Sequence, residues 1–187
     1  MRRAPGTFAR RSRLDRRRVE LGGDAFSASL REVDFRSPVQ VLGSLNETYQ
    51  MHTGSDLYFT IWYGVYHPAD RRLEYACAGH PPALLIDALG TLQPLKTKGV
   101  PIGFVPQVKY ESRVTTIPLN ARLYLLSDGT YEVEKPGGGM LSVADLAQFM
   151  SRSSLSASDL DEWWKYLLQL HGDPLLEDDY SIVRFHF

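Results

Sequence analysis

The stretch that most constrains this fold runs over residues 58–86 and reads YFTIWYGVYHPADRRLEYACAGHPPALLI. In its first part Phe59, Ile61 and Tyr63 share one face, and the residues between them share the other. Such a period of two in β-branched and aromatic residues is typical of a β-strand. A proline-containing turn breaks the run, and two further extended segments follow it. The stretch therefore predicts strand, turn, strand, kink and strand, which is the skeleton of an antiparallel sheet.

The segments on either side of this stretch extend it into a mixed pattern of helices and strands. Ser37 and Pro38 suit the start of a helix, and apolar residues then recur at helical spacing, which predicts a helix over residues 38–50. Further strands are expected at 91–95, 110–117, 122–127 and 180–187, and further helices after Ser142 and around Trp163 and Trp164. This order favours an α+β sandwich over alternating βαβ units.

The charges are distributed unevenly along the chain. Residues 1–18 hold eight arginines against Asp15, a net charge of +7, whereas residues 19–187 hold 13 basic and 21 acidic side chains, a net charge of −8. Residues 1–36 are open to three interpretations: a disordered tail, a nucleic-acid-binding arm, or a segment that is not a normal part of the fold. Because no interleaved aromatic residues or folded basic face accompany the arginines, the pattern does not favour nucleic acid as a partner.

The length and the cysteine content limit the class of protein. A chain of 187 residues suits one domain, and its single cysteine excludes an internal disulfide framework, which favours a reducing compartment. No apolar run approaches the roughly 18 residues that a membrane span needs. The arginine-rich start also lacks the apolar region of a secretory signal. These features predict a cytoplasmic protein without a membrane partner.

Acidic residues stand at the ends of two predicted strands. Asp128 follows an apolar strand and precedes Gly129, and Asp178 and Asp179 precede the last strand. Carboxylates at strand ends can share a hard cation such as Mg²⁺ or Mn²⁺, and a glycine leaves room for the backbone to approach. Acidic residues are also common turn formers. The spacing by itself leaves both interpretations open.

Three other residue types invite a functional role that the sequence supports less well. His80, in a Gly-His-Pro-Pro kink, is expected to bond nearby backbone rather than a metal. Cys77 lacks the arginine six positions later that a cysteine phosphatase uses, since residue 83 is alanine, and is predicted to be a small buried strand residue. Trp163 and Trp164 are expected in the core or an interface.

Four segments carry a resemblance to a known family, and they occur in that family's order: FTIWYGV at 59–65, YACAGHPP at 75–82, LLSDG at 125–129 followed by Glu132, and DDYSIV at 178–183. Over Ser37 to Phe187 the chain resembles the SpoIIE/RsbU-type branch of the PPM (protein phosphatase 2C-like) serine/threonine phosphatases. The resemblance implies an α-β-β-α sandwich, in which two antiparallel sheets are flanked by helices.

The resemblance also implies a reaction. It is the metal-dependent hydrolysis of phosphoserine or phosphothreonine on a signalling protein such as an anti-sigma-factor antagonist. Asp128 and Asp178 match two metal ligands of the family's two-metal site, which takes Mn²⁺ or Mg²⁺. In such sites the metal ions lower the pKa of a bound water and neutralise the phosphoryl oxygens.

One family motif has no counterpart in this sequence. Family members carry an Asp-Val-Ser-Gly-His-Gly-like motif whose aspartate bridges both metals, and residues 1–36 contain nothing similar. We therefore expect residues 1–36 to be an arginine-rich atypical segment and residues 37–187 to be the C-terminal two-thirds of a phosphatase-like domain, N-terminally truncated or altered. The alternative is a catalytically impaired domain that acts as a protein-binding or dimerisation module. Apolar surface exposed by the missing elements would favour a homodimer.

Overall fold

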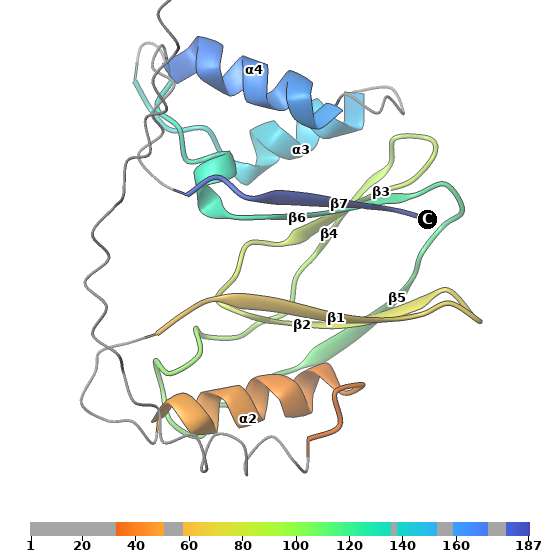
Figure 1. Cartoon of the computed structure of the whole chain (residues 1–187), viewed down its shortest axis with the longest axis vertical. Coiled ribbons are helices and arrows are strands. Elements are labelled where there is room, and N and C mark those ends of the chain that lie inside the picture. The colour runs from red at the N-terminus through yellow and green to blue at the C-terminus, as the bar shows by residue number, and fades with distance from the viewer. Residues whose placement is uncertain (1–32, 51–57, 136–137, 153–158, 172–178) are drawn as a thin grey trace, which may run out of the picture.

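The protein folds into two antiparallel sheets enclosed between helices (Figure 1). The structure is a computed structural model that describes residues 33–50, 58–135, 138–152, 159–171 and 179–187. The predicted α+β class and its α-β-β-α layering are confirmed. Most of the predicted N-terminal segment, residues 1–32, lies outside the described residues. None of the helices in the described ranges combines the length and the apolar character that a membrane span requires.

The first sheet contains three strands in the order β1-β2-β5. Their bounds are Ile61–His67 for β1, Arg72–Ala78 for β2 and Ser112–Thr116 for β5. Both pairings are antiparallel, and Ile61 lies opposite Ala78. The predicted alternation holds, because Ile61 and Tyr63 pack on the helix side whereas Trp62 and Tyr66 face the other sheet. Residues 61–78 of the opening stretch therefore form one edge and the middle of this sheet. The last predicted strand of the stretch, residues 83–86, belongs to the other sheet, so the expectation of a single sheet for the whole stretch is wrong: the chain crosses to the second layer after the kink at residues 79–82.

The second sheet contains four strands in the order β4-β3-β6-β7. Their bounds are Ala83–Ile86 for β3, Leu92–Leu95 for β4, Arg122–Leu126 for β6 and Ile182–His186 for β7. All pairings are antiparallel. Strand β3 is buried along its whole length, because it is central in the sheet and is covered on both faces. The predicted strands at 110–117 and 180–187 are shorter in the structure, which assigns only their central residues.

Three helices cover the outer faces of the sheets (Figure 1). Helix α2 spans Pro38–Gln50, as predicted, and covers the three-stranded sheet; α3 spans Val143–Arg152 and α4 spans Asp159–His171 over the four-stranded sheet. Ser142 caps α3, as expected. The amide of Asp145 donates to the Ser142 Oγ at 3.3 Å, and the Ser142 amide donates to the Asp145 carboxylate at 2.8 Å.

Apolar side chains fill the three spaces between these layers. The cluster between the sheets includes Leu73, Leu85 and Leu123, each almost fully buried. On the same strands, the side chains next in sequence point the other way, so that Tyr124 packs toward α3 and α4. This alternation follows from the period of a strand, which sends successive side chains to opposite faces. It explains why strands β2, β3 and β6 carry long apolar runs.

A buried ionic cluster ties α4 to the four-stranded sheet. Asp159, at the start of α4, is fully buried, and its carboxylate pairs with Arg122 at 3.0 Å. The same carboxylate accepts hydrogen bonds from the Tyr124 hydroxyl and from Arg184. Because a buried carboxylate is stable only when it is paired and hydrogen-bonded, this cluster fixes where α4 begins.

Candidate functional site

Asp128 lies at the end of β6, where the chain leaves the sheet. It opens a short 3₁₀ helix, η1, which spans Asp128–Thr130. The Asp128 side chain is exposed, and its Oδ1 accepts a hydrogen bond from the Gly129 amide at 3.1 Å. The predicted position, an exposed carboxylate directly after a buried strand, is therefore found. Its role as a metal ligand remains a prediction.

The backbone around Asp128 is held by several hydrogen bonds. The amide and the Oγ1 of Thr130 both donate to the Ser127 carbonyl oxygen, at 3.2 and 2.5 Å. The amides of Tyr131 and Glu132 donate to the Asp128 carbonyl oxygen at 2.9 and 2.8 Å. Each bond removes freedom from the turn that carries the carboxylate. Asp128 is therefore presented to solvent from a fixed backbone.

Trp163 of α4 forms a hydrogen bond to the same turn. Its indole Nε1 donates to the Thr130 carbonyl oxygen at 2.8 Å, and its side chain is only 1% exposed. The sequence predicts a core or interface position for this tryptophan, which is correct. It does not predict the bond to Thr130, because the two residues are 33 positions apart. Helix α4 is thereby tied to the turn that carries Asp128.

Ser127 joins the end of β6 to the chain that enters β7. The Ser127 amide donates to the Ser181 carbonyl oxygen at 2.9 Å, and the Ser181 amide donates to the Ser127 Oγ at 2.9 Å. The Ser127 Oγ also donates to the Asp179 carbonyl oxygen at 2.8 Å. Asp128 is therefore the residue after Ser127, whose hydroxyl is hydrogen-bonded to the Asp179 backbone. Asp178, the other predicted ligand, lies outside the described residues.

The donor atoms at this strand end match in kind the metal ions that the resemblance implies. The oxygen ligands of Asp128 and of the acidic pair that precedes β7 are of the kind that Mg²⁺ and Mn²⁺ prefer. Among the described residues, however, no group of three or more His, Cys, Asp or Glu side chains could hold a metal ion. The described donors therefore suit the cation in kind and are too few for a two-metal centre.

His80 lies near this strand end and behaves as predicted. Its Nδ1 donates to the carbonyl oxygen of Pro81 at 2.9 Å, so the ring is bonded to nearby backbone. The ring also lines a cavity of about 200 Å³ together with Ser127 and Ser181. His80 therefore adjoins the site without being assigned as a ligand.

Two other titratable side chains are excluded from proton or nucleophile chemistry at neutral pH. Burial raises the pKa of the Cys77 thiol, which is 1% exposed, so the protein disfavours the reactive thiolate. Burial, followed by the negative charges of Glu132 and Asp128, raises the pKa of Tyr131 to about 12. Both groups remain protonated, and Cys77 is the buried strand residue that was predicted.

The chain has relatives in both sequence and structure. The family model of stage II sporulation protein E (SpoIIE) matches residues 23–187. Phosphoserine phosphatase RsbP of Bacillus subtilis (strain 168) is 32% identical over 100 residues, which cover 51% of this chain and 25% of RsbP. The chain therefore spans about a quarter of the length of this curated relative.

Two solved structures resemble the fold. The SiaA-PP2C domain of Pseudomonas aeruginosa superposes with a TM-score of 0.73 at 19% identity, covering 90% of this chain and 68% of that one. The phosphatase domain of the cell fate determinant SpoIIE from Bacillus subtilis, presoaked with Mn, superposes with a TM-score of 0.58 at 15% identity, covering 98% and 75%. At such identities the likeness concerns the fold alone.

Proposed function

The chain belongs to the SpoIIE family of PPM-type serine/threonine phosphatases, and from this premise we propose that it is a metal-dependent protein phosphatase domain. Its substrate would be a phosphoserine or phosphothreonine on a signalling partner such as an anti-sigma-factor antagonist. The family that the four sequence segments predicted is thereby confirmed. The reaction in this chain, its substrate and its metal are our proposal.

One observation carries this proposal. The hydrogen bonds of Ser127 to Asp179 and Ser181 hold the ends of β6 and β7 together at the point where Asp128 leaves the sheet. We assign Asp128 and Asp178 as ligands of one divalent cation, Mn²⁺ or Mg²⁺, at this point. When bound, such a cation supplies charge that neutralises phosphoryl oxygens. The protein's part is to present the Asp128 carboxylate from a fixed turn.

The test is phosphatase turnover on a phosphoserine peptide in excess Mn²⁺. We expect turnover that is lost on chelation and that falls by more than about a hundredfold in Asp128→Asn, since even outer-shell partners of a metal cost 10- to 100-fold. The matched control is Asp161→Asn, an exposed aspartate in the first turn of α4. If the wild type shows no Mn²⁺-dependent turnover, or if Asp128→Asn keeps it, the proposal is wrong.

A second candidate function is a non-catalytic module that binds a protein or forms a homodimer. Two observations favour it: the shortage of described metal donors, and an apolar cavity of about 430 Å³ lined by Trp62, Leu125 and Phe187. Phe185, on the edge strand β7, also lines this cavity and is 46% exposed. Exposed apolar surface of this kind favours association. Calorimetry that finds two tight Mn²⁺ sites per chain would exclude this function as the sole account.

The remaining assignments concern the extent and location of the domain. We propose residues 37–187 as the phosphatase-like body and residues 1–36 as a separate, arginine-rich segment. We also propose a cytoplasmic location, because a chain with one cysteine suits a reducing compartment.

A further inference from the structure

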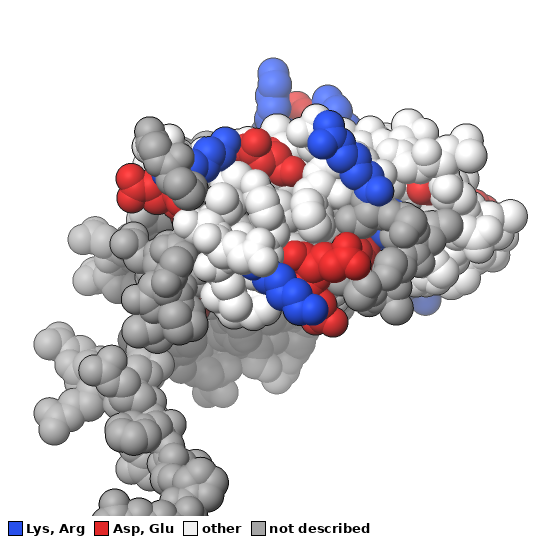
Figure 2. Space-filling view, turned by 90° about the horizontal axis from the view of Figure 1, so that it is seen from above, with Lys and Arg blue, Asp and Glu red and all other residues white. Residues whose placement is uncertain are grey.

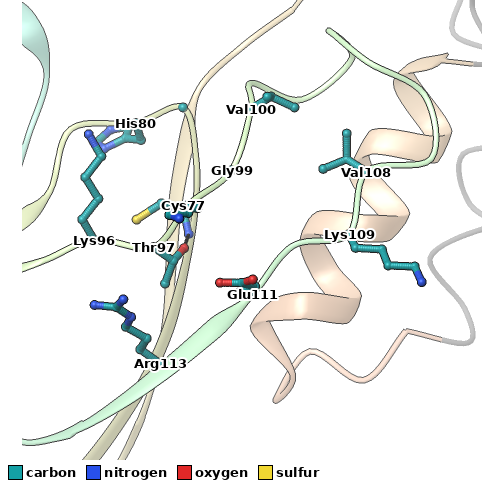
Figure 3. A pocket seen from close by; sticks show the side chains of 12 residues that line it. Cys77, His80, Lys96, Thr97, Gly99, Val100, Val108, Lys109, Glu111 and Arg113 are labelled. Carbon is teal, nitrogen blue, oxygen red and sulfur yellow. Dashed lines mark hydrogen bonds between the residues drawn. The ribbon is translucent and has the colours of Figure 1, made fainter.

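A cavity of about 620 Å³ opens beside β2 and the loop that follows β4 (Figure 3). Its wall includes Gly79 and His80 after β2, residues 96–100 after β4, and Lys109, Glu111 and Arg113 around the start of β5. Three segments that are distant in the sequence therefore build one hollow. Asp128, the described residue that we propose as a metal ligand, is not part of this wall.

The cavity is basic, although the body of the protein is acidic. Four cationic side chains line it, Lys96, Lys98, Lys109 and Arg113, against one acidic side chain, Glu111, so its lining carries an excess of three positive charges. Residues 19–187 carry a net charge of −8. A local reversal of sign in a hollow attracts anions, because low-dielectric walls focus the field.

These cations are not neutralised within the described part of the chain. There, ion pairs within 4.0 Å engage Arg72, Arg122, Lys135 and Arg184, and none of them includes a cation of this cavity. The face over α3 and α4 is different, since basic and acidic side chains are interspersed across it (Figure 2). The cavity therefore differs from that face in gathering cations around one hollow, with a single acidic side chain among them.

The loop that carries Lys96 and Lys98 is anchored between them. Thr97 is buried, and its Oγ1 accepts a hydrogen bond from the Cys77 amide at 2.8 Å. The Gly79 amide donates to the Gly99 carbonyl oxygen at 3.0 Å. With Thr97 fixed inward, both lysines are exposed. The positions from which these charges extend are thus set before any ligand binds.

The charged side chains do not all point the same way. Lys96 extends toward the His80 ring, whereas Lys109 points away from the other labelled side chains (Figure 3). His80 also lines the smaller cavity that contains Ser127 and Ser181. His80 therefore lines both cavities, and the smaller one also reaches Ser127, the residue before Asp128.

We propose that this basic cavity binds an acidic segment of the phosphoprotein substrate, next to the phosphorylated residue. The inference rests on the proposed function for the identity of the partner, and on Lys96, Lys98 and Arg113 for the recognition. The occupant is assigned as a carboxylate-rich peptide because its charges complement the excess of positive charge. Exposed lysines on a fixed loop suit the capture of such a segment without one rigid binding pose.

The direct test is binding of a fluorescent glutamate-rich peptide to the whole chain, measured by anisotropy without metal. We expect Lys98→Glu/Arg113→Glu to weaken binding about five- to thirtyfold, since two exposed charge pairs worth up to about 1 kcal/mol each are lost. Raising the salt concentration should weaken binding to the wild type and have less effect on the double variant. Lys165→Glu, a single charge reversal at an exposed position of α4, is the control and should bind as the wild type does.

Three results would overturn the proposal: no binding of the peptide, equal weakening by Lys165→Glu, or tighter binding of a single-stranded oligonucleotide of matched charge. The last would assign the cavity to nucleic acid. The measurement is independent of turnover. If the peptide binds as expected and no Mn²⁺-dependent hydrolysis is found, the docking inference stands and the catalytic proposal fails. If hydrolysis is found and the acidic peptide does not bind, the opposite holds.

Discussion

Gly99 lies where the loop after β4 passes closest to β2. A Cβ at this position would lie 2.1 Å from the Cys77 carbonyl oxygen, which is backbone and cannot rotate away. Gly79 meets a similar constraint, with a φ of 71° and Pro101 at 2.7 Å from a Cβ. Two glycines thus permit the close approach that forms the floor of the basic cavity. At this scale the fold depends on the absence of a side chain.

We expect Gly99→Ala to lower the free energy of unfolding by about 1–3 kcal/mol, because the added methyl group forces the backbone apart. Urea denaturation measures this change. Gly43→Ala is the matched control: it lies in α2 with nothing within 4 Å of its Cβ, so alanine there should stabilise the protein by about 0.5–1 kcal/mol. Equal effects of the two substitutions would contradict this account.

At the scale of elements, helix α4 supports the turn that presents Asp128. It reaches the turn through Trp163, and its first residue, Asp159, is held by the buried ionic cluster with Arg122. The helix is thereby positioned at its start by charge and along its length by packing and one hydrogen bond. A substitution in α4 should therefore perturb η1, which α4 contacts directly, more than it perturbs the three-stranded sheet.

Trp163→Phe tests this connection. Phenylalanine keeps most of the apolar contact and leaves the Thr130 carbonyl oxygen without its donor, which should cost about 1–3 kcal/mol of stability. Hydrogen exchange at the amides of residues 130–132 should accelerate at the same time. The control is Trp164→Phe, because this neighbouring tryptophan is half-buried and packs against Tyr180. If both variants lose the same stability and protection, the bond does not hold the turn.

At the scale of the whole molecule, the sandwich buries tyrosines as well as aliphatic residues. Burial, followed by Glu132 and Asp128, raises the pKa of Tyr131 to about 12, and burial, followed by Asp161, raises that of Tyr180 to about 12. Both groups are neutral in the folded and in the unfolded chain below pH 10, which is the ordinary pKa. Between pH 10 and about pH 12 the unfolded chain releases the protons of these two tyrosines, whereas the folded chain retains them.

The folded state should therefore lose stability as the pH rises from about 10 to about 12, because the unfolded state binds fewer protons in this window. Denaturation at a series of pH values, with phenolate absorbance followed in parallel, measures the loss. Tyr131→Phe/Tyr180→Phe should show a shallower decline than the wild type. Parallel curves would contradict the assignment of the pKa shifts to these two residues.

The sequence alone was sufficient for most of the fold. The period of two from Phe59 onward and the helical spacing from Pro38 onward are local patterns, and they predicted the elements in their correct order. Asp128 could also be located, because an acidic residue followed by glycine after an apolar run marks a strand end. The strand and helix periods and the strand end at Asp128 depend on residues that are close together in the sequence, so they can be predicted without the tertiary structure.

Only the tertiary structure decided what meets at the site. The bond from Trp163 to Thr130, the pairing of Asp159 with Arg122 and the basic cavity join segments that are tens of residues apart. Lys96, Lys98 and Arg113 look in the sequence like ordinary surface charges, and nothing in their spacing brings them together. Hydrophobic periodicity encodes which face of an element is buried, whereas the convergence of charges depends on how the sheets stack. For this reason local sequence segments identify the family, whereas the basic cavity that we propose for recognition forms only through long-range contacts.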